Sequence, residues 1–509
     1  MSTARTWAVA ITGVDGHLVE VEADLSNQTP DFKIIGLPDK SLGEAVQRVH
    51  NACKNSGVDL PRRRLTVNLS PASLPKHGSS FDLAIAIAAL AASDAVVRRS
   101  SRATVHIGEL GLDGRIRPVA GVLPAVFAAA RAGFDQVIVP HANVEEARLV
   151  PGIDVRAAAS LAEVAVWHGA RIEAPEVAPV PGVPVQQDRV EELDISDVVG
   201  QEDAVAALVI AAAGGHHMLL SGPPGAGKTM LARRLPGILP ALTQEEALEV
   251  ASIRSLTGES VAALDTIPPF EAPHHGASVA ALVGGGSRAA RPGAIVRAHR
   301  GVLFLDEAAE FSRVALDALR QPLESGGIEV IRSGFTARFP ARFQLLLAMN
   351  PCPCGNYGVR GGECTCPSQA IRRYSARLSG PLRDRVDIEV RMARVPASRA
   401  TTGAHGDLDT IAARERVAEA RARAARRWAG TPWARNADVP GTWLRQGEFR
   451  LAAPTREPLD RALERGALTL RGYDRVLRVA WTMADVSGIE RPGVHEIGRA
   501  LTLRRGMTP

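Results

Sequence analysis

The chain has 509 residues, which is too many for one hydrophobic core, so about two to four domains are expected. Hydrophobic residues make up 46% of the sequence and charged residues 23%, and this composition excludes a largely disordered protein. The formal charge of +5 allows contact with nucleic acid but does not demand it.

A membrane or secreted protein is not expected. The sequence has no run of about 18 apolar residues, and its first residues lack the basic start and apolar stretch of a signal peptide. We therefore expect a cytoplasmic protein without membrane contact. In such a reducing compartment, clustered cysteines are more often metal ligands or free thiols than disulfides.

Four segments follow one another along the chain. Residues 1–172 alternate short apolar runs with Ala-rich helical stretches, which indicates an α/β domain. Residues 173–192 are rich in Pro and Val and predict an extended linker. Residues 193–395 again alternate apolar strands with helices, as expected for a parallel sheet covered on both faces. Residues 396–509 are rich in Arg and predict a helical C-terminal domain.

A phosphate-binding loop is predicted where an apolar strand passes into a helix, in "MLLSGPPGAGKTML" (218–231). Glycines let backbone amides curl around phosphate oxygens, the lysine adds a positive charge, and the threonine hydroxyl can bind Mg²⁺. The residues predicted to bind ATP are Gly222, Pro223, Pro224, Gly225, Ala226, Gly227, Lys228 and Thr229. An ordinary glycine turn is the alternative, but strand, loop and helix stand in the order that nucleotide binding requires.

A second apolar strand, in "RGVLFLDEAAEF" (300–311), ends in two carboxylates. Ligands of open α/β sheets bind at the carboxyl ends of the strands. We expect Asp306 to hold Mg²⁺, directly or through water, and Glu307 to act as the general base on the attacking water. A solvated acidic turn is the alternative, and it is disfavoured because both motifs follow strands in the right order.

Two further elements complete the predicted nucleotide site. The strand "RFQLLLAMN" (342–350) ends in Asn350, whose amide can orient water beside the γ-phosphate. Downstream, "SGPLRDRVDIEV" (379–390) offers Arg383 and Arg385 as cations for the charge that develops in phosphoryl transfer. These motifs in this order resemble the AAA+ ATPases, which work as rings in which one subunit supplies an arginine to its neighbour's ATP.

Longer stretches resemble one AAA+ family more closely. They are "GLPDKSLGEAVQRVHNACKNSG" (36–57), "PFEAPHHGASVAALVGGGSRAARPGAIVRAHRGVLFLDEAAEF" (269–311), "NPCPCG" (350–355) and "SGPLRDRVDI" (379–388). The chain resembles the YifB/ComM family of magnesium-chelatase-like AAA+ ATPases over essentially its whole length. The resemblance implies a Lon-protease-like (ribosomal S5 domain 2-like) N-terminal domain, an AAA+ core at 193–395 and a chelatase-type helical lid at 396–509.

The same resemblance implies roles for residues and partners. The 222–229 loop matches Walker A, Asp306 and Glu307 match Walker B, Asn350 matches sensor 1, and Arg385 matches the arginine finger. In the lid, Arg471 matches sensor 2, with Arg478 as the second choice and a surface or helix-pairing role as the alternative. Members of this family are implicated in natural transformation as hexameric DNA helicases that drive branch migration, so ATP, Mg²⁺, DNA and a hexameric ring are expected.

The resemblance to Lon raises the question of peptidase activity. Ser80, in "PKHGSSFDLAIA" (75–86), matches the nucleophile, but the position of the lysine base is Leu123. A serine hydroxyl is a poor nucleophile without a base, and nothing in the sequence places Lys76 for that role. We therefore expect an inactive protease scaffold, retained for oligomerisation or DNA handling.

Four cysteines gather in "NPCPCGNYGVRGGECTCP" (350–367). Cys352, Cys354, Cys364 and Cys366 could supply four thiolates to tetrahedral Zn²⁺. However, Cys-x-Cys is tighter than the usual two-residue spacer, so four reduced cysteines in a turn remain the alternative.

Three segments are candidates for contacts to DNA, and for any single arginine in them a solvated surface position is the alternative. Residues 326–343 predict a β-hairpin carrying Arg332 and Arg338, and the segments 272–278 and 284–293 are candidates for loops that face a ring pore. The rival functions are the ATPase subunit of a magnesium-chelatase-like complex, an ATPase that remodels proteins, and an ATP-dependent protease, which Leu123 disfavours. Stimulation of ATP hydrolysis by forked or single-stranded DNA would separate the DNA motor from the first two.

Overall fold

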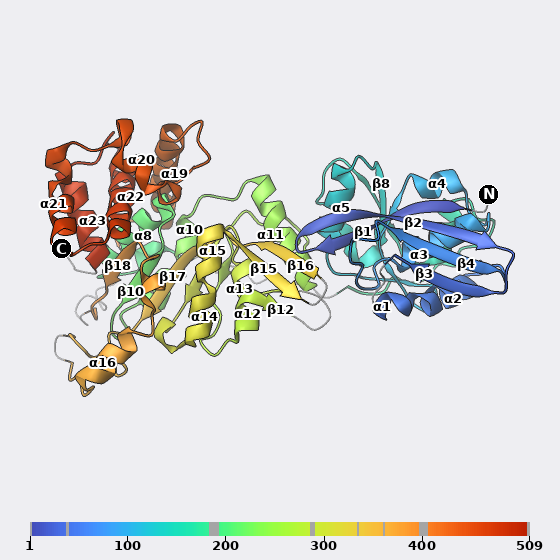
Figure 1. Cartoon of the computed structure of the whole chain (residues 1–509), viewed down its shortest axis with the longest axis horizontal. Helices are drawn as coiled ribbons and strands as arrows, with labels where there is room; N and C mark the ends of the chain where they lie inside the picture. The colour runs from blue at the N-terminus through green and yellow to red at the C-terminus, as the bar shows by residue number, and fades with distance from the viewer. Residues whose placement is uncertain are drawn as a thin grey trace.

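A computed structural model describes residues 3–36, 40–182, 193–285, 291–332, 335–359, 362–395 and 406–505. Parts of the predicted linker and of the 284–293 segment, and the side chain of Arg332, lie outside the described residues. The molecule is elongated, with the N-terminal domain at one end, an α/β domain in the middle and a helical domain at the other end (Figure 1). Within the described residues, no helix is long and apolar enough to cross a membrane.

The N-terminal domain contains a mixed seven-stranded sheet in the order β3-β4-β2-β1-β5-β8-β9. Its strands are β1 (Ala4–Thr12), β2 (Asp15–Ser26), β3 (Asp31–Ile35), β4 (Arg64–Ser70), β5 (Val105–His106), β8 (Gln136–Pro140) and β9 (Asp154–Ala158). Helix α3 (Asp82–Ala92) is apolar on all sides after its first residue, and every residue in it is buried. This helix packs against β1 and β2 and forms the centre of the domain core.

The central domain contains five strands that pair in parallel, in the order β11-β14-β17-β10-β18. They are β10 (Met218–Ser221), β11 (Phe270–Glu271), β14 (Val302–Leu305), β17 (Gln344–Met349) and β18 (Ile388–Arg391). Strands β14 and β17 are apolar throughout apart from Gln344 and are completely buried, as expected when helices cover both faces of a parallel sheet. All five carboxyl ends therefore lie at one edge, which confirms the α/β prediction for this segment.

The C-terminal helices share a hydrophobic core with the central domain. Helices α19 (Thr410–Arg427) and α22 (Leu470–Ser487) pack on α8 (Glu202–Gly214), and the same core contains residues of β10 and β18. The remaining helices of this part are α20 (Gly441–Arg445), α21 (Ala453–Glu464) and α23 (Val494–Arg505). The position of the helical domain is therefore fixed against the sheet rather than left to a linker.

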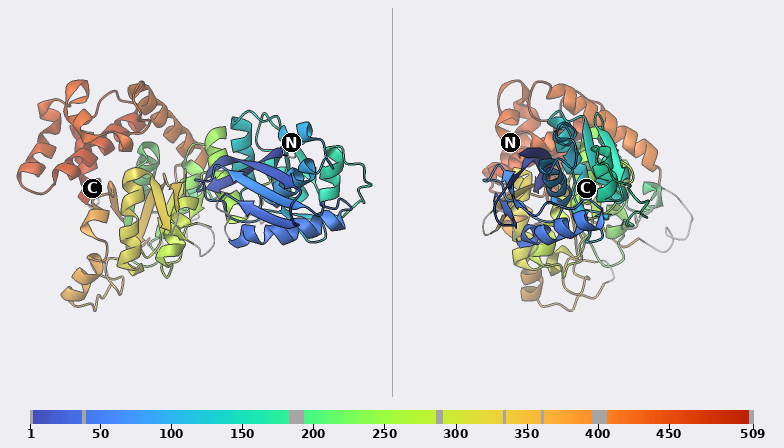
Figure 2. Two further views of the ribbon diagram at one scale, coloured as in Figure 1. Left: turned by 45° about the vertical axis from the view of Figure 1, so that its right-hand side comes forward. Right: turned by 90° about the vertical axis from the view of Figure 1, so that its right-hand side faces the viewer.

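The predicted hairpin is formed by β15 (Gly327–Arg332) and β16 (Phe335–Pro340), which pair antiparallel. The N-terminal domain touches it at the β1–β2 turn. Gly13 has φ +67° there, and a Cβ added to it would lie 2.0 Å from the carbonyl oxygen of Arg338, so only glycine fits. The two domains lie side by side at this point in both Figure 1 and Figure 2.

A second contact joins α5 (Val122–Arg131) of the N-terminal domain to α11 (Gln244–Thr257) of the central domain. The amide of Gly121 donates to the carbonyl of Ser255 at 2.9 Å, and the amide of Leu123 donates to the hydroxyl of Ser255 at 3.3 Å. Leu123 also shares an apolar cluster with Leu248 and Ala251 of α11. The position where a Lon-type protease would carry its lysine therefore belongs to a joint between domains.

Candidate nucleotide-binding site

The predicted phosphate-binding loop joins β10 to α9 (Lys228–Ala232). Gly225 and Gly227 have φ of +76° and +86°, a backbone conformation that side chains rarely adopt. The ammonium of Lys228 donates to the carbonyls of Gly222 at 2.7 Å and Pro223 at 3.0 Å, so it lies at the mouth of the loop. Burial lowers the pKa of Lys228, while the carboxylates of Asp306 and Glu307 oppose that shift.

Hard oxygen ligands for Mg²⁺ meet beside this loop. The hydroxyl of Thr229 donates to Oδ2 of Asp306 at 2.6 Å, although 77 residues separate them in the sequence. A hydroxyl at the start of α9 and a carboxylate directly after β14 fit Mg²⁺, which prefers oxygen ligands and retains several waters. The donor set therefore suits the metal that the sequence predicted.

Asn350 lies in the same place because β17 is the neighbour of β10, with Met349 paired to Ser221. The side-chain oxygen of Asn350 accepts a hydrogen bond from Lys228 at 3.0 Å. The amide is therefore next to the group that would contact the terminal phosphates. Three separate motifs of the sequence therefore meet at one edge of the sheet: the 222–229 loop, Asp306 with Glu307, and Asn350.

Glu307 has φ of +50°, a left-handed conformation that is uncommon for a residue with a side chain. This turn follows β14, and the amide of Glu307 donates to Oδ1 of Asp306 at 2.9 Å. Oε2 of Glu307 lies 3.2 Å from Nδ1 of His275. Residues 272–278 are a candidate pore loop from the sequence, and the structure places His275 of this segment against the expected general base. The signal that could have located it is the order of strands, because β11 precedes His275 and ends at the same edge as β14.

Family models match three segments of the chain. The model for subunit ChlI of magnesium chelatase matches residues 194–400, that for subunit ChlI of Mg-chelatase matches 21–143, and that for the ChlI C-terminal region matches 408–504. The chain is 40% identical to the competence protein ComM of Haemophilus influenzae, over 99% of this chain and 98% of that protein. The chain belongs to the YifB/ComM family of magnesium-chelatase-like AAA+ ATPases.

Two further family members match over similar lengths. Protein YifB of Escherichia coli is 39% identical over 96% of this chain and 94% of that protein. An uncharacterized protein of Mycobacterium tuberculosis is 49% identical over 99% of each chain. Membership of this family supports ATPase activity with ATP and Mg²⁺.

Arg385 of this AAA+ ATPase lies at the opposite edge of the sheet from its own phosphate-binding loop. It precedes β18, whose first residue, Ile388, pairs with Met218 at the start of β10. The loop follows the end of β10, four residues further on, which is about 13 Å at 3.3 Å per residue. Arg385 is therefore positioned away from the nucleotide site of its own chain.

The side chain of Arg385 is 12% exposed and forms an ion pair with Glu324 of α15 (Arg320–Ser325). Its Nε is buried without a hydrogen-bond partner among the described residues. Burial and the nearby guanidinium groups of Arg320, Arg475 and Arg471 lower the pKa of Arg385. Arg385 thus belongs to a group of arginines at this edge, with one donor still unsatisfied.

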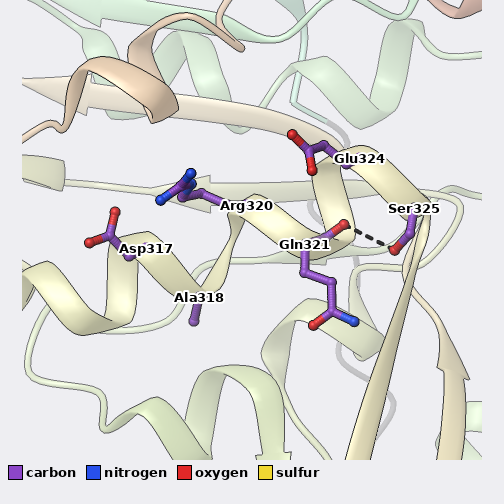
Figure 3. A pocket seen from close by; sticks show the side chains of 6 residues that line it. All are labelled: Asp317, Ala318, Arg320, Gln321, Glu324 and Ser325. Carbon is purple, nitrogen blue, oxygen red and sulfur yellow. Dashed lines mark hydrogen bonds between the residues drawn. The ribbon is translucent and has the colours of Figure 1, made fainter.

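Glu324 lines a surface hollow together with Asp317, Ala318, Arg320, Gln321 and Ser325. Figure 3 shows Arg320 and Glu324 pointing to one side of α15, while Gln321 points to the other. The hydroxyl of Ser325 donates to the carbonyl of Gln321 at 3.0 Å, which closes the end of this helix. The acidic partner of Arg385 therefore lies at a surface that a second subunit could reach.

The other candidate arginines differ in their surroundings. Arg471 is exposed near Arg385, so it too lies at the edge opposite the phosphate-binding loop. Arg383 forms two hydrogen bonds with Glu389 at 2.9 and 2.8 Å, and Arg478 donates to the carbonyl of Val439 at 2.7 Å. Burial lowers the pKa of Arg478. Arg383 and Arg478 therefore have structural partners within the chain.

The four clustered cysteines come together directly after Asn350. Cys352 is completely buried, and Cys354, Cys364 and Cys366 are partly buried. All four sulfur atoms lie within 4.8 Å of one another. A hydrogen bond from the amide of Asn356 is the largest cause that lowers the pKa of the Cys354 thiol, to about 6.

The residues that resemble a protease dyad do not form one in the described structure. The side chain of Lys76 is buried, and its amine donates to the carbonyls of Gly36 and Pro71. Leu123 is buried in the joint between domains, and Ser80 is partly exposed. The inactive protease scaffold stays a prediction.

Proposed function

We propose that this chain is a subunit of an ATP-driven ring motor, a hexamer, that acts on single-stranded or branched DNA in natural transformation or recombination. The observation that carries the proposal is the separation of the two halves of the ATP site. The phosphate-binding loop lies at one edge of the sheet and Arg385 at the other. Head-to-tail packing of identical subunits brings such edges together and closes into a ring when the rotation permits.

The residues of the site divide the chemistry as follows. The 222–229 loop and Lys228 hold the phosphates of ATP, and Thr229 and Asp306 hold Mg²⁺, which supplies positive charge there. Glu307 accepts the proton of the attacking water, and Asn350 orients that water. The oxygen of this water bonds to the γ-phosphorus as the bond from that phosphorus to the bridging oxygen breaks, giving ADP and phosphate. Arg385 and Arg471 of the neighbouring subunit stabilise the charge that develops.

His275 adds a control on the general base. Its ring lies 3.2 Å from the carboxylate of Glu307, which is where a hydrogen bond can turn the base toward or away from water. His275 also lies in the 272–278 segment, which the sequence predicted as a candidate pore loop. We propose that contact with DNA is relayed to hydrolysis through this pair.

DNA is proposed as the partner because of the hairpin and the relatives. Arg338 of β16 is 80% exposed and is paired with Glu329 at 2.7 Å on the neighbouring strand, so its guanidinium reaches solvent. Exposed arginines track the phosphate backbone without reading sequence. The relative ComM is named as a competence protein, which supports a role in DNA uptake or integration for this chain as well.

A magnesium-chelatase-like ATPase subunit is the alternative, supported by the three family matches. The test is an ATPase assay of the purified chain with single-stranded, duplex, forked and four-way DNA, and with a DNA-free control. Stimulation by forked or single-stranded DNA, reduced in Arg338→Ala but not in Arg313→Ala, supports the DNA motor. Arg313 is a matched control because it is 82% exposed and lies on α14 (Arg313–Ala318), away from the hairpin. Equal rates with every DNA and without DNA would argue for the alternative.

A further inference from the structure

We propose that Cys352, Cys354, Cys364 and Cys366 form a structural Zn²⁺ site that supports the phosphate-binding loop and Asn350. This inference rests on the geometry of the cysteine cluster and stands even if the partner of the motor is not DNA. Three observations carry it: the distances between the sulfurs, the donors around them, and the contact of the cluster with the ATP site.

The distances match a tetrahedron. Cys352 and Cys354 have sulfurs 3.4 Å apart, Cys352 and Cys364 3.8 Å, and Cys354 and Cys364 3.7 Å. A Zn–S bond of about 2.3 Å makes each edge of a ZnS₄ tetrahedron about 3.8 Å. A disulfide would hold two sulfurs about 2.05 Å apart, and all four cysteines are free. The four groups therefore surround one point rather than forming two pairs.

The backbone around the sulfurs is arranged to stabilise thiolates. The amide of Tyr357 donates to the sulfur of Cys352 at 3.3 Å, and the amide of Asn356 donates to Cys354. Gly355 has φ of +80° and its amide donates to the carbonyl of Cys352 at 3.0 Å, which closes a tight turn directly after the two ligands. Binding of Zn²⁺ releases the four thiol protons and leaves a site of charge −2, which these amides partly neutralise.

The cluster is built against the nucleotide site. A Cβ added to Gly355 would lie 2.4 Å from Cδ of Pro224, so the bend rests directly on the phosphate-binding loop. Asn350 precedes Cys352 by two residues, and its side chain contacts Lys228. On the other side, Cys366 is followed by α16 (Ser368–Ser375), whose buried Tyr374 is hydrogen-bonded to the backbone of Asn350. A metal ion at this point would fix the positions of the phosphate-binding loop, Asn350 and α16 relative to one another, which a loop without metal would leave independent.

The alternatives to zinc are four reduced thiols, a pair of disulfides that respond to oxidation, and iron. Four thiolates in a tetrahedron suit either Zn²⁺ or iron by geometry. We commit to Zn²⁺, because the cluster has no redox partner in the chemistry of ATP hydrolysis. Each alternative gives a different result in the measurement below.

The experiment is metal analysis of the full-length chain, purified without added metal or chelator, by plasma mass spectrometry. We expect about one zinc per chain, and about one zinc released on titration of the thiols with a mercurial. Cys354→Ser and Cys366→Ser are expected to lose most of the zinc. Cys53→Ala is the matched control, because Cys53 is buried in the N-terminal domain, and it should keep the metal.

The second measurement is the affinity for a fluorescent ADP analogue. We expect the dissociation constant to rise about tenfold in the zinc-free variants, as misplacement of a binding loop weakens positioned contacts. Gly355→Ala should keep zinc yet also weaken binding, because the methyl group meets Pro224. If a cysteine variant does not fold, chelator-stripped wild type provides the same comparison. Wild type that contains no zinc, that contains iron, or that has disulfides in place of thiols overturns the proposal.

Discussion

The proposed ATP site, shared between neighbouring subunits, predicts how inactive subunits behave when they are mixed. Lys228→Ala removes the phosphate contact within a chain, and Arg385→Ala removes the cation that the chain offers to a neighbour. Each variant alone should be nearly inactive, because an arginine that stabilises phosphoryl transfer contributes about 10³-fold or more to the rate. A site works only where the loop comes from an Arg385→Ala subunit and the arginine from a Lys228→Ala subunit.

The expected activity of the mixture follows from the fraction of sites that combine an intact loop with an intact arginine. In an equimolar random mixture, half of the subunits carry an intact loop, and half of their neighbours carry an intact arginine. About a quarter of the sites are therefore complete, whatever the size of the ring. ATPase activity plotted against composition should be a parabola with its maximum at equal amounts. The double variant Lys228→Ala with Arg385→Ala should lower wild-type activity as the square of the wild-type fraction.

The assay is steady-state phosphate release. Before it, the homo-oligomers of the two variants are dissociated into subunits at low concentration, mixed and allowed to reassemble together. Arg148→Ala in place of Arg385→Ala is the control, because Arg148 is 60% exposed in the N-terminal domain, and this variant should be active by itself. Activity that stays at the background at every ratio, in mixed rings verified by two different tags, would refute a site shared between subunits.

Three further predictions test single residues. Lys228→Ala should abolish binding of a fluorescent ATP analogue, since the ammonium is the positive charge at the mouth of the loop. Glu307→Gln should bind this analogue with nearly unchanged affinity but hydrolyse ATP about 10²–10³-fold more slowly, because an amide cannot accept the proton; wild-type turnover would remove Glu307 as the base. Burial raises the pKa of Glu146 from 4.5 to about 7, so the folded chain keeps a proton that the unfolded chain loses. Stability should therefore fall between about pH 4.5 and 7, by roughly 3 kcal/mol in total, and stay low above pH 7. The thermal unfolding midpoint, measured from pH 5 to 8, should depend less on pH in Glu146→Gln than in wild type. Glu145→Gln should keep the wild-type dependence, because the side chain of Glu145 is 71% exposed.

The nucleotide site could be predicted from the sequence because each of its parts is local. A strand, a glycine loop and a helix, or a strand ending in Asp306 and Glu307, can be recognised within about ten residues. Parallel pairing then brings their carboxyl ends together without further information, as the contact between Thr229 and Asp306 shows. The hairpin at β15 and β16 was predictable for the same reason.

Contacts that depend on the packing of distant segments could not be predicted. His275 meets Glu307 only because β11 is next to β14, and the ion pair of Arg385 with Glu324 depends on where α15 lies. The joint at Leu123 required knowledge that α5 packs on α11. In each case the residue type is ordinary, and the information lies in the order of strands and the docking of domains.

The N-terminal domain is attached at two separate places, the β1–β2 turn on β16 and the Gly121 region on α11. A single contact would allow the N-terminal domain to rotate about it, whereas two contacts on different elements resist rotation about either one. A shift of the hairpin must consequently carry the whole seven-stranded sheet with it or break the fit at Gly13. If the hairpin moves during the proposed ATPase cycle, the N-terminal domain should move with it, and a spectroscopic label on β4 would record that movement.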